Sequence, residues 1–122
     1  MIKYIRNLVI DMKKIELLAP AGNMEALIAA IQAGCDAVYI AGDHFGARAF
    51  AKNFSNDGIV EAINYAHLYG VKVYITVNTL IYENEVDSFV DYIRFIHKNN
   101  VDAVLIQDLG MFDLLRKKFP NL

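Results

Sequence analysis

The sequence has few of the features that mark specialised classes of protein. Its single cysteine, Cys35, excludes a disulfide within the chain and any four-thiolate metal or iron–sulfur centre built by this chain alone. With 12 basic and 14 acidic residues it has no broad basic surface to attract nucleic acid. Apolar runs stay well short of the ~20 residues of a membrane helix, and Arg6, Asn7 and Asp11 interrupt any signal-peptide core. We therefore expect a cytoplasmic protein with no membrane contact.

Common catalytic signatures are missing as well. The sequence contains no Gly-x-Gly-x-x-Gly, P-loop or Gly-x-Ser-x-Gly segment. His44, His67 and His97 lack metal-ligand spacing, so we expect no metal site, and we interpret His67 and His97 as surface or packing residues. Cys35 follows a predicted helix at the end opposite the expected site, where a small apolar residue fits. A nucleophilic thiol is therefore not expected.

What is present is a regular alternation of strand and helix patterns. The 122 residues are 56% hydrophobic, which is enough to bury a core without a disulfide or a metal. Four aliphatic runs without polar alternation predict buried parallel strands at residues 15–19, 36–41, 71–77 and 102–106. Segments of helical period follow each of them. The pattern predicts an α/β fold of four βα units on a parallel sheet.

A weak internal repeat supports this interpretation. Residues 34–40 are echoed by residues 100–106 and more loosely by residues 70–75, at a spacing of about 30 to 36 residues that is typical of successive βα units. Gly34, Gly70 and Asn100 open these segments, where a left-handed residue is expected to end the preceding helix.

The parity of the strand residues predicts which way their side chains point. One parity is aliphatic and suits packing against helices: Val38, Ile40, Val73, Ile75, Val77, Val104 and Ile106. The other is more polar and is expected to face the interior of a barrel or its mouth: Glu16, Tyr39, Tyr74, Thr76, Asn78, Leu105 and Gln107.

Candidate binding residues follow the carboxyl ends of the predicted strands, where loops of parallel α/β folds converge. They are Asp43, Arg48, Asn78, Thr79, Gln107 and Asp108. The loop 42–54 is longer than the usual ~2 to 6 residues, which suggests a binding loop. In it, Arg48 has the fork geometry to hold a carboxylate or phosphate, Asp43 can accept a proton, and phenylalanines can wall a pocket: Phe45, Phe50 and Phe54. Alternatively, Asp43 caps a turn and Arg48 pairs with a neighbouring acid.

The remaining candidates also have two interpretations. Asn78 and Gln107 can recognise a planar polar group, or they can pair with loop backbone. Asp108 is a candidate acid or base, or the cap of the helix that follows it. Asn23 and Glu25 favour the start of a helix, although backbone N–H groups near Gly22 offer weak grounds for an anion site.

A series of segments resembles the collagenase-like peptidases, a family of unassigned catalytic type. The matching segments are residues 16–27, 33–40, 45–48, 53–54, 77–79 and 104–110, in the family's order and spacing. Cys35 and Gly46 differ from the alanine and serine expected there. The resemblance covers residues 14–122 and implies a parallel (β/α) half-barrel of the TIM-barrel type over residues 15–122, preceded by an extension over residues 1–14.

The resemblance implies several functions. The family is usually described as proteases, so the first expectation is a collagenase-like peptidase with unknown catalytic residues. Other members hydroxylate tRNA, ribosomal RNA or a quinone precursor, so the alternative is a component of such a hydroxylase; a third is a non-catalytic assembly module. The family's cysteine motifs lie beyond this sequence, so an iron–sulfur cluster would need residues outside it. Because a closed barrel takes eight strands, we expect a homo-oligomer or a missing C-terminal half, with peptide or RNA as substrate.

Overall fold

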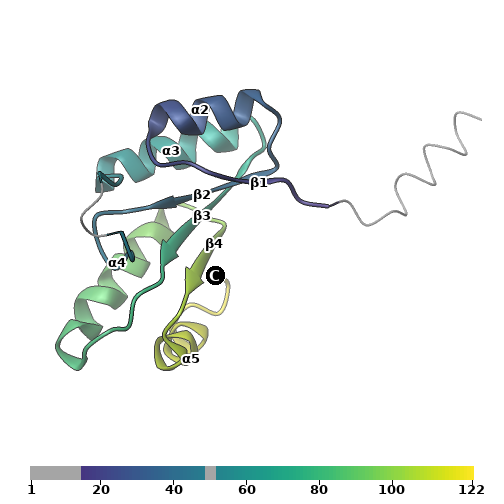
Figure 1. Ribbon diagram of the computed structural model, residues 1–122. Helices are drawn as coiled ribbons and strands as arrows, with labels where there is room; N and C mark the ends of the chain where they lie inside the picture. Colours follow the sequence, from purple (N-terminus) through teal and green to yellow (C-terminus); the bar gives the residue numbers. More distant parts are fainter. Residues whose placement is uncertain (1–14, 49–51) are drawn as a thin grey trace, which may run out of the picture.

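The computed structural model describes residues 15–48 and 52–122 of the chain. The predicted N-terminal extension and Phe50 lie outside these residues. Strands and helices alternate as predicted in a (β/α) half-barrel (Figure 1). In chain order the elements are β1 (Leu18–Pro20), α2 (Met24–Gln32), β2 (Ala37–Ala41), α3 (Asn56–Leu68), β3 (Lys72–Val77), the 3-10 helix η1 (Glu83–Glu85), α4 (Val86–Lys98), β4 (Ala103–Ile106) and α5 (Leu109–Lys118).

The four strands form one parallel sheet in the order β1-β2-β3-β4. β1 is shorter than predicted: it begins at Leu18, which pairs with Ala37, and Ile15 is 90% exposed. The regular ladder cannot start earlier, because the Leu17 N–H donates to the Asp36 carboxylate (2.8 Å) instead of to a backbone carbonyl. The other three strands agree with prediction to within one residue at their starts.

The helices begin and end where the sequence signals predict. The Asn23 side chain accepts a hydrogen bond from the Ala26 N–H and so caps α2. Gly34, Gly70 and Asn100 have φ values of 94°, 70° and 66°, which is the left-handed conformation expected after α2, α3 and α4. η1, which precedes α4, was not predicted. None of the helices described is long and apolar enough to cross a lipid bilayer.

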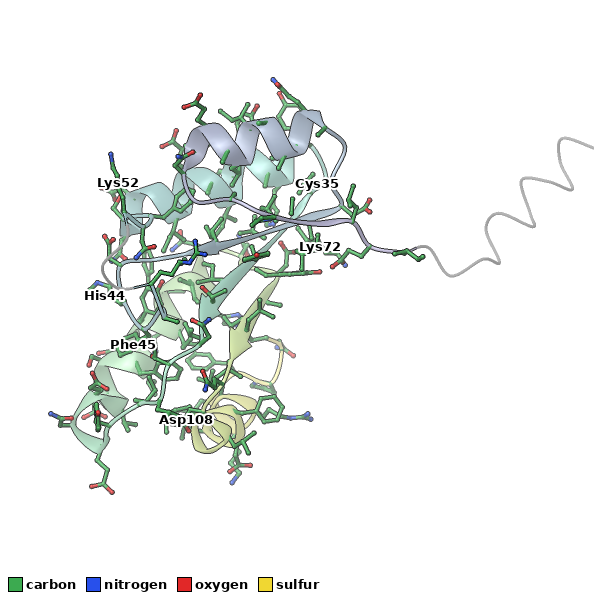
Figure 2. All side chains as sticks on the ribbon, viewed as in Figure 1. Cys35, His44, Phe45, Lys52, Lys72 and Asp108 are labelled. Atoms are coloured by element: carbon green, nitrogen blue, oxygen red, sulfur yellow. The ribbon has the colours of Figure 1, made fainter. Side chains whose placement is uncertain are left out.

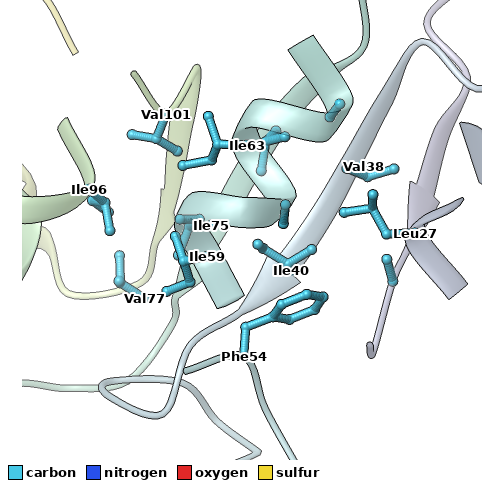
Figure 3. Close-up of a cluster of buried hydrophobic side chains, with 14 of the residues drawn as sticks. Leu27, Val38, Ile40, Phe54, Ile59, Ile63, Ile75, Val77, Ile96 and Val101 are labelled. Atoms are coloured by element: carbon cyan, nitrogen blue, oxygen red, sulfur yellow. The ribbon is translucent and has the colours of Figure 1, made fainter. Parts of the chain in front are cut away.

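The two faces of the sheet differ as the parity of the strands predicts. Val38, Ile40, Val73, Ile75 and Val77 are fully or almost fully buried against the helices on the outer side of the curved sheet (Figures 1 and 3). This layer contains the hydrophobic core, and burial of its aliphatic side chains is the main stabilising contribution to the fold.

The opposite, concave face is open. On it the Tyr74 hydroxyl donates a hydrogen bond to the Glu16 carboxylate (2.7 Å), which raises the pKa of Tyr74 to about 12. Leu18 and Leu105, one on each outer strand, are 40% and 42% exposed. This is the face that a closed barrel would enclose.

Candidate functional site

The loops after the strands gather at one end of the sheet, which we call the rim. Figure 2 shows His44, Phe45, Lys52 and Asp108 at this end, and Cys35 and Lys72 at the other. The arrangement follows from the parallel pairing, because the carboxyl ends of parallel strands lie at the same edge.

The described parts of the long loop after β2, residues 42–48 and 52–54, are bound to the rest of the protein. It returns to its own starting point, where the Phe54 N–H donates to the Ala41 carbonyl (2.9 Å). Phe45 has a φ of 59°, an uncommon conformation for a bulky residue. Its ring packs edge-on against Phe89 of α4, with centroids 5.3 Å apart. The aromatic contact keeps the loop against the body of the protein.

Two of the predicted binding residues directly follow β3 and form hydrogen bonds with the same loop. The Asn78 Oδ1 accepts a hydrogen bond from the Ala47 N–H (2.9 Å), and the Thr79 hydroxyl donates to the Phe45 carbonyl (3.0 Å). Pairing with loop backbone was one of the two interpretations for Asn78. The bond uses only the amide oxygen, so the amide nitrogen is oriented and remains able to donate.

A cavity of about 460 Å³ lies at the rim, on the concave side of the sheet. It is lined by Pro20, Ala21, Gly22, Tyr39, Ile40, Ala41, Ala47, Arg48, Lys52, Asn53, Thr76 and Asn78. Two of these residues are cations, Arg48 and Lys52, and within the described part of the chain no carboxylate lines the cavity. Its volume is within the range of small-molecule pockets.

The predicted candidates are only partly brought together. Arg48 and Asn78 line the cavity, whereas Asp43, Thr79, Gln107 and Asp108 are at the same end of the sheet but not in its wall. Tyr39 and Thr76 also line it, as the parity of β2 and β3 indicated. Lys52 and Asn53 also line the cavity and are not among the candidates, although they belong to the long loop predicted to bind a ligand.

Asp108 has a structural role as the N-terminal cap of α5. Its two carboxylate oxygens accept hydrogen bonds from the Met111 N–H at the start of α5 and from the Ile81 N–H in the loop after β3, both at 3.0 Å. These bonds, the one from Ile81 first, lower the pKa of Asp108. The geometry therefore supports helix capping, and a carboxylate held ionised is poorly suited to proton transfer near neutral pH.

Cys35 and two histidines lie away from the rim. Cys35 is buried between α2 and β2, and burial raises the pKa of its thiol, which disfavours the reactive thiolate. The His67 ring contacts the Asp102 carboxylate (2.7 Å), which also accepts from the Val73 N–H at the amino end of β3. The His97 ring packs against Phe119.

Comparisons with known proteins agree on one family. The sequence profile of peptidase family U32 matches residues 22–122. The chain is 38% identical over 110 residues to the tRNA hydroxylation protein P1 of Bacillus subtilis. It is 41% identical over 103 residues to an uncharacterized protease of Methanocaldococcus jannaschii, and 40% identical over 101 residues to a 23S rRNA 5-hydroxycytidine synthase of Escherichia coli.

These matches cover most of this chain and a small part of each relative. They include 90%, 84% and 83% of the chain, but only 26%, 25% and 15% of the three relatives. The chain therefore spans about a quarter or less of the length of these proteins.

Proposed function

The chain belongs to peptidase family U32, whose profile matches residues 22–122, and on this premise we propose that it supplies the first half-barrel of an RNA-hydroxylating protein. The observation that carries the proposal is the similarity, along nearly the whole chain, to proteins named for hydroxylation of tRNA and of 23S rRNA. Further tRNA hydroxylation proteins match over 91% of the chain. Such an activity would take place in the cytoplasm, where these RNAs are found.

The rim cavity fits a role in holding RNA. Arg48 and Lys52 bring two positive charges to the mouth of a half-barrel whose chain has a net charge of -2. A local cation pair in an otherwise acidic protein favours contact with a polyanion at that point rather than over a broad surface. This role needs a single-stranded or exposed nucleotide, which is the form in which bases become accessible to enzymes.

The chain would contribute binding, and the hydroxylation chemistry would need further residues. An iron–sulfur cluster is held by several cysteine thiolates, whereas this sequence has only Cys35, buried away from the rim. The residues of this chain therefore do not fit such a cluster. We assign no catalytic step to them.

The test is the nucleoside composition of RNA from cells with and without the gene. Hydrolysed tRNA and 23S rRNA would be compared by liquid chromatography and mass spectrometry for nucleosides 16 Da heavier than their parents. We expect at least one such nucleoside to disappear on deletion and to return when the gene is restored. An unchanged nucleoside profile in both RNAs would contradict the proposal.

A protease is the second candidate, because of the similarity to the uncharacterized protease of Methanocaldococcus jannaschii. Among the described residues, the rim cavity has no side chains in an arrangement typical of a peptidase: Cys35 is remote and Asp108 is a helix cap. Incubation of the chain with gelatin, alone and with the remaining part of a relative supplied separately, tests this function. Cleavage would support the protease, and intact gelatin in every combination would count against it.

A further inference from the structure

The rim cavity is lined by side chains that carry positive charge or can donate hydrogen bonds. Its polar side chains include two cations, Arg48 and Lys52, an amide, Asn78, and the hydroxyl group of Tyr39. Both cations are exposed at the loop surface, and neither forms an ion pair with any residue of the described ranges. Charged side chains without a protein counter-ion at a concave site favour an anionic ligand.

Asn78 adds an oriented donor to this set. Its Oδ1 is occupied by the Ala47 N–H at 2.9 Å, so the amide plane is fixed and its two N–H groups point away from that bond. The amide nitrogen has no hydrogen-bond partner within the ranges that the structure describes. An amide held through its oxygen keeps both N–H donors available, which suits an acceptor-rich ligand.

The start of α2 adds to the positive electrostatic potential at the rim cavity. Gly22 lines the cavity, and α2 begins two residues later with Asn23 as its cap. The unpaired N–H groups of a helix start carry a partial positive charge. This contribution is secondary to the two cations, but it has the same sign.

The cavity is larger than a bare oxyanion requires. A volume of about 460 Å³ leaves room for a ring beside a charged group. Tyr39, Ile40 and Thr76 supply a mixed apolar and hydroxyl wall on the strands, and the cations lie on the loop side. The arrangement has a charged side and a less polar side, as a nucleotide does.

From these observations we propose that the rim cavity is a nucleotide phosphate site, in which Arg48 and Lys52 bind the phosphate oxygens and the Asn78 amide nitrogen donates to the same group. The inference deepens the proposed function, on which it rests for the choice of RNA as the source of the phosphate. A phosphodiester of RNA and a free phosphate monoester share this chemistry. The experiment therefore includes both.

The experiment measures binding by the full chain. Fluorescein-labelled single-stranded RNA would be titrated with protein at low salt and followed by anisotropy, then displaced with 5′-AMP or with inorganic phosphate. We expect Arg48→Gln combined with Lys52→Gln to weaken RNA binding about tenfold or more, because each lost charge-assisted bond is worth a substantial part of that factor. Displacement by 5′-AMP is also expected, since it carries the same phosphate.

The matched control removes two charges elsewhere. Lys72, at the opposite end of the sheet, and Lys98, in the last turn of α4, are both exposed, and Lys72→Gln combined with Lys98→Gln changes the net charge by the same amount (Figure 2). We expect this variant to bind RNA within about twofold of the parent, because distant surface charges are screened. Circular dichroism melts of both variants establish that they are folded.

Several outcomes would overturn the site. Equal weakening in the two double variants would indicate a diffuse charge effect, and RNA binding that 5′-AMP cannot displace would place the RNA elsewhere. Absence of RNA, 5′-AMP and phosphate binding would also refute it. The nucleoside profile is independent of these readouts, so a lost modification without binding here would refute the phosphate site alone. Binding with an unchanged profile would refute the hydroxylation function and leave the site standing.

Discussion

Tyr92 has a hydroxyl group that is buried without a hydrogen-bond partner in the described part of the protein. Burial, with a smaller effect of the Asp43 charge, raises its pKa to about 12. Because a buried unpaired hydroxyl opposes folding, we expect Tyr92→Phe to leave the free energy of unfolding unchanged or to raise it by up to about 1 kcal/mol. Urea denaturation measures this difference.

Tyr74→Phe is the matched control for Tyr92→Phe. It removes the same atom, but the Tyr74 hydroxyl donates to Glu16 at 2.7 Å, so its loss should lower the free energy of unfolding. A clear destabilisation by Tyr92→Phe would show instead that the Tyr92 hydroxyl makes a useful interaction.

Asp108 should make the stability of the protein depend on pH. Its pKa is lowered in the fold, so its ionised form stabilises the protein above the ordinary Asp value of about 3.9, and this contribution is lost as the pH falls through the lower folded value. Asp108→Asn should therefore lower the melting temperature at neutral pH, and the difference from the parent should shrink in acid. Thermal melts between pH 7 and pH 2 test this. A difference that stays constant with pH would contradict it.

The sequence could locate the rim but not the wall of the cavity. Arg48 and Asn78 were candidates because they follow predicted strands, and both line the cavity. Lys52 was missed because its position depends on the return of the loop to Ala41, through the Phe54 N–H bond, which no local pattern encodes. For Asp108 the sequence leaves two roles open, and the hydrogen bonds that its carboxylate accepts from the Met111 N–H and from the distant Ile81 N–H favour the structural one.

The connection between β2 and its loop depends on a close approach at Gly42. A Cβ atom there would collide with the Tyr92 hydroxyl and lie 2.9 Å from the Ile59 Cδ1. We expect Gly42→Ala to lower the free energy of unfolding by about 1 to 3 kcal/mol, the usual cost of overpacking. The loss should be about 1 kcal/mol smaller in a Tyr92→Phe background, because one of the colliding atoms is then absent.

Gly22→Ala is the control for Gly42→Ala. A Cβ atom at Gly22 meets nothing within 4 Å, so we expect a change within about 0.5 kcal/mol. If Gly42→Ala lowers the free energy of unfolding equally in the parent and in Tyr92→Phe, the Tyr92 hydroxyl does not limit the space at Gly42.

The regular elements were predictable because their signals are local. Strand parity separated the buried Val73, Ile75 and Val77 from the half-buried Tyr74 and Thr76 without any knowledge of the fold. The start of β1 was not predictable, since it is set by where β2 begins, nineteen residues later, and by the Asp36 carboxylate. The sequence does not predict η1, because three residues are too few to show a helical period.

The sheet has two outer strands, β1 and β4, each paired on one side only within the described ranges. Their free N–H and C=O groups, with the half-exposed Leu18 and Leu105, can pair with another parallel edge. We expect the isolated chain to form a dimer in which β4 of each copy lies beside β1 of the other, since a twofold axis then leaves no open edge. Light scattering coupled to size-exclusion chromatography measures the mass.

Leu105→Lys tests whether these edges cause the association. A charge on the concave side of β4 should shift the dimer toward monomer, because edge charges oppose strand pairing. Lys98→Gln on the outer helix α4 is the control and should not change the mass. A monomer at all concentrations, or a dimer insensitive to Leu105→Lys, would be incompatible with edge pairing.

The order of the strands in space is the order in which the ribosome makes them. Each new strand therefore meets a neighbour that has already been synthesised, and no later segment has to be inserted between two earlier ones. The first two units can dock while the next is still emerging, since their contacts join nearby parts of the chain. The growing sheet is then extended at one edge only, beside the strand made last, which limits the time for which each new strand stays unpaired and available to other nascent chains.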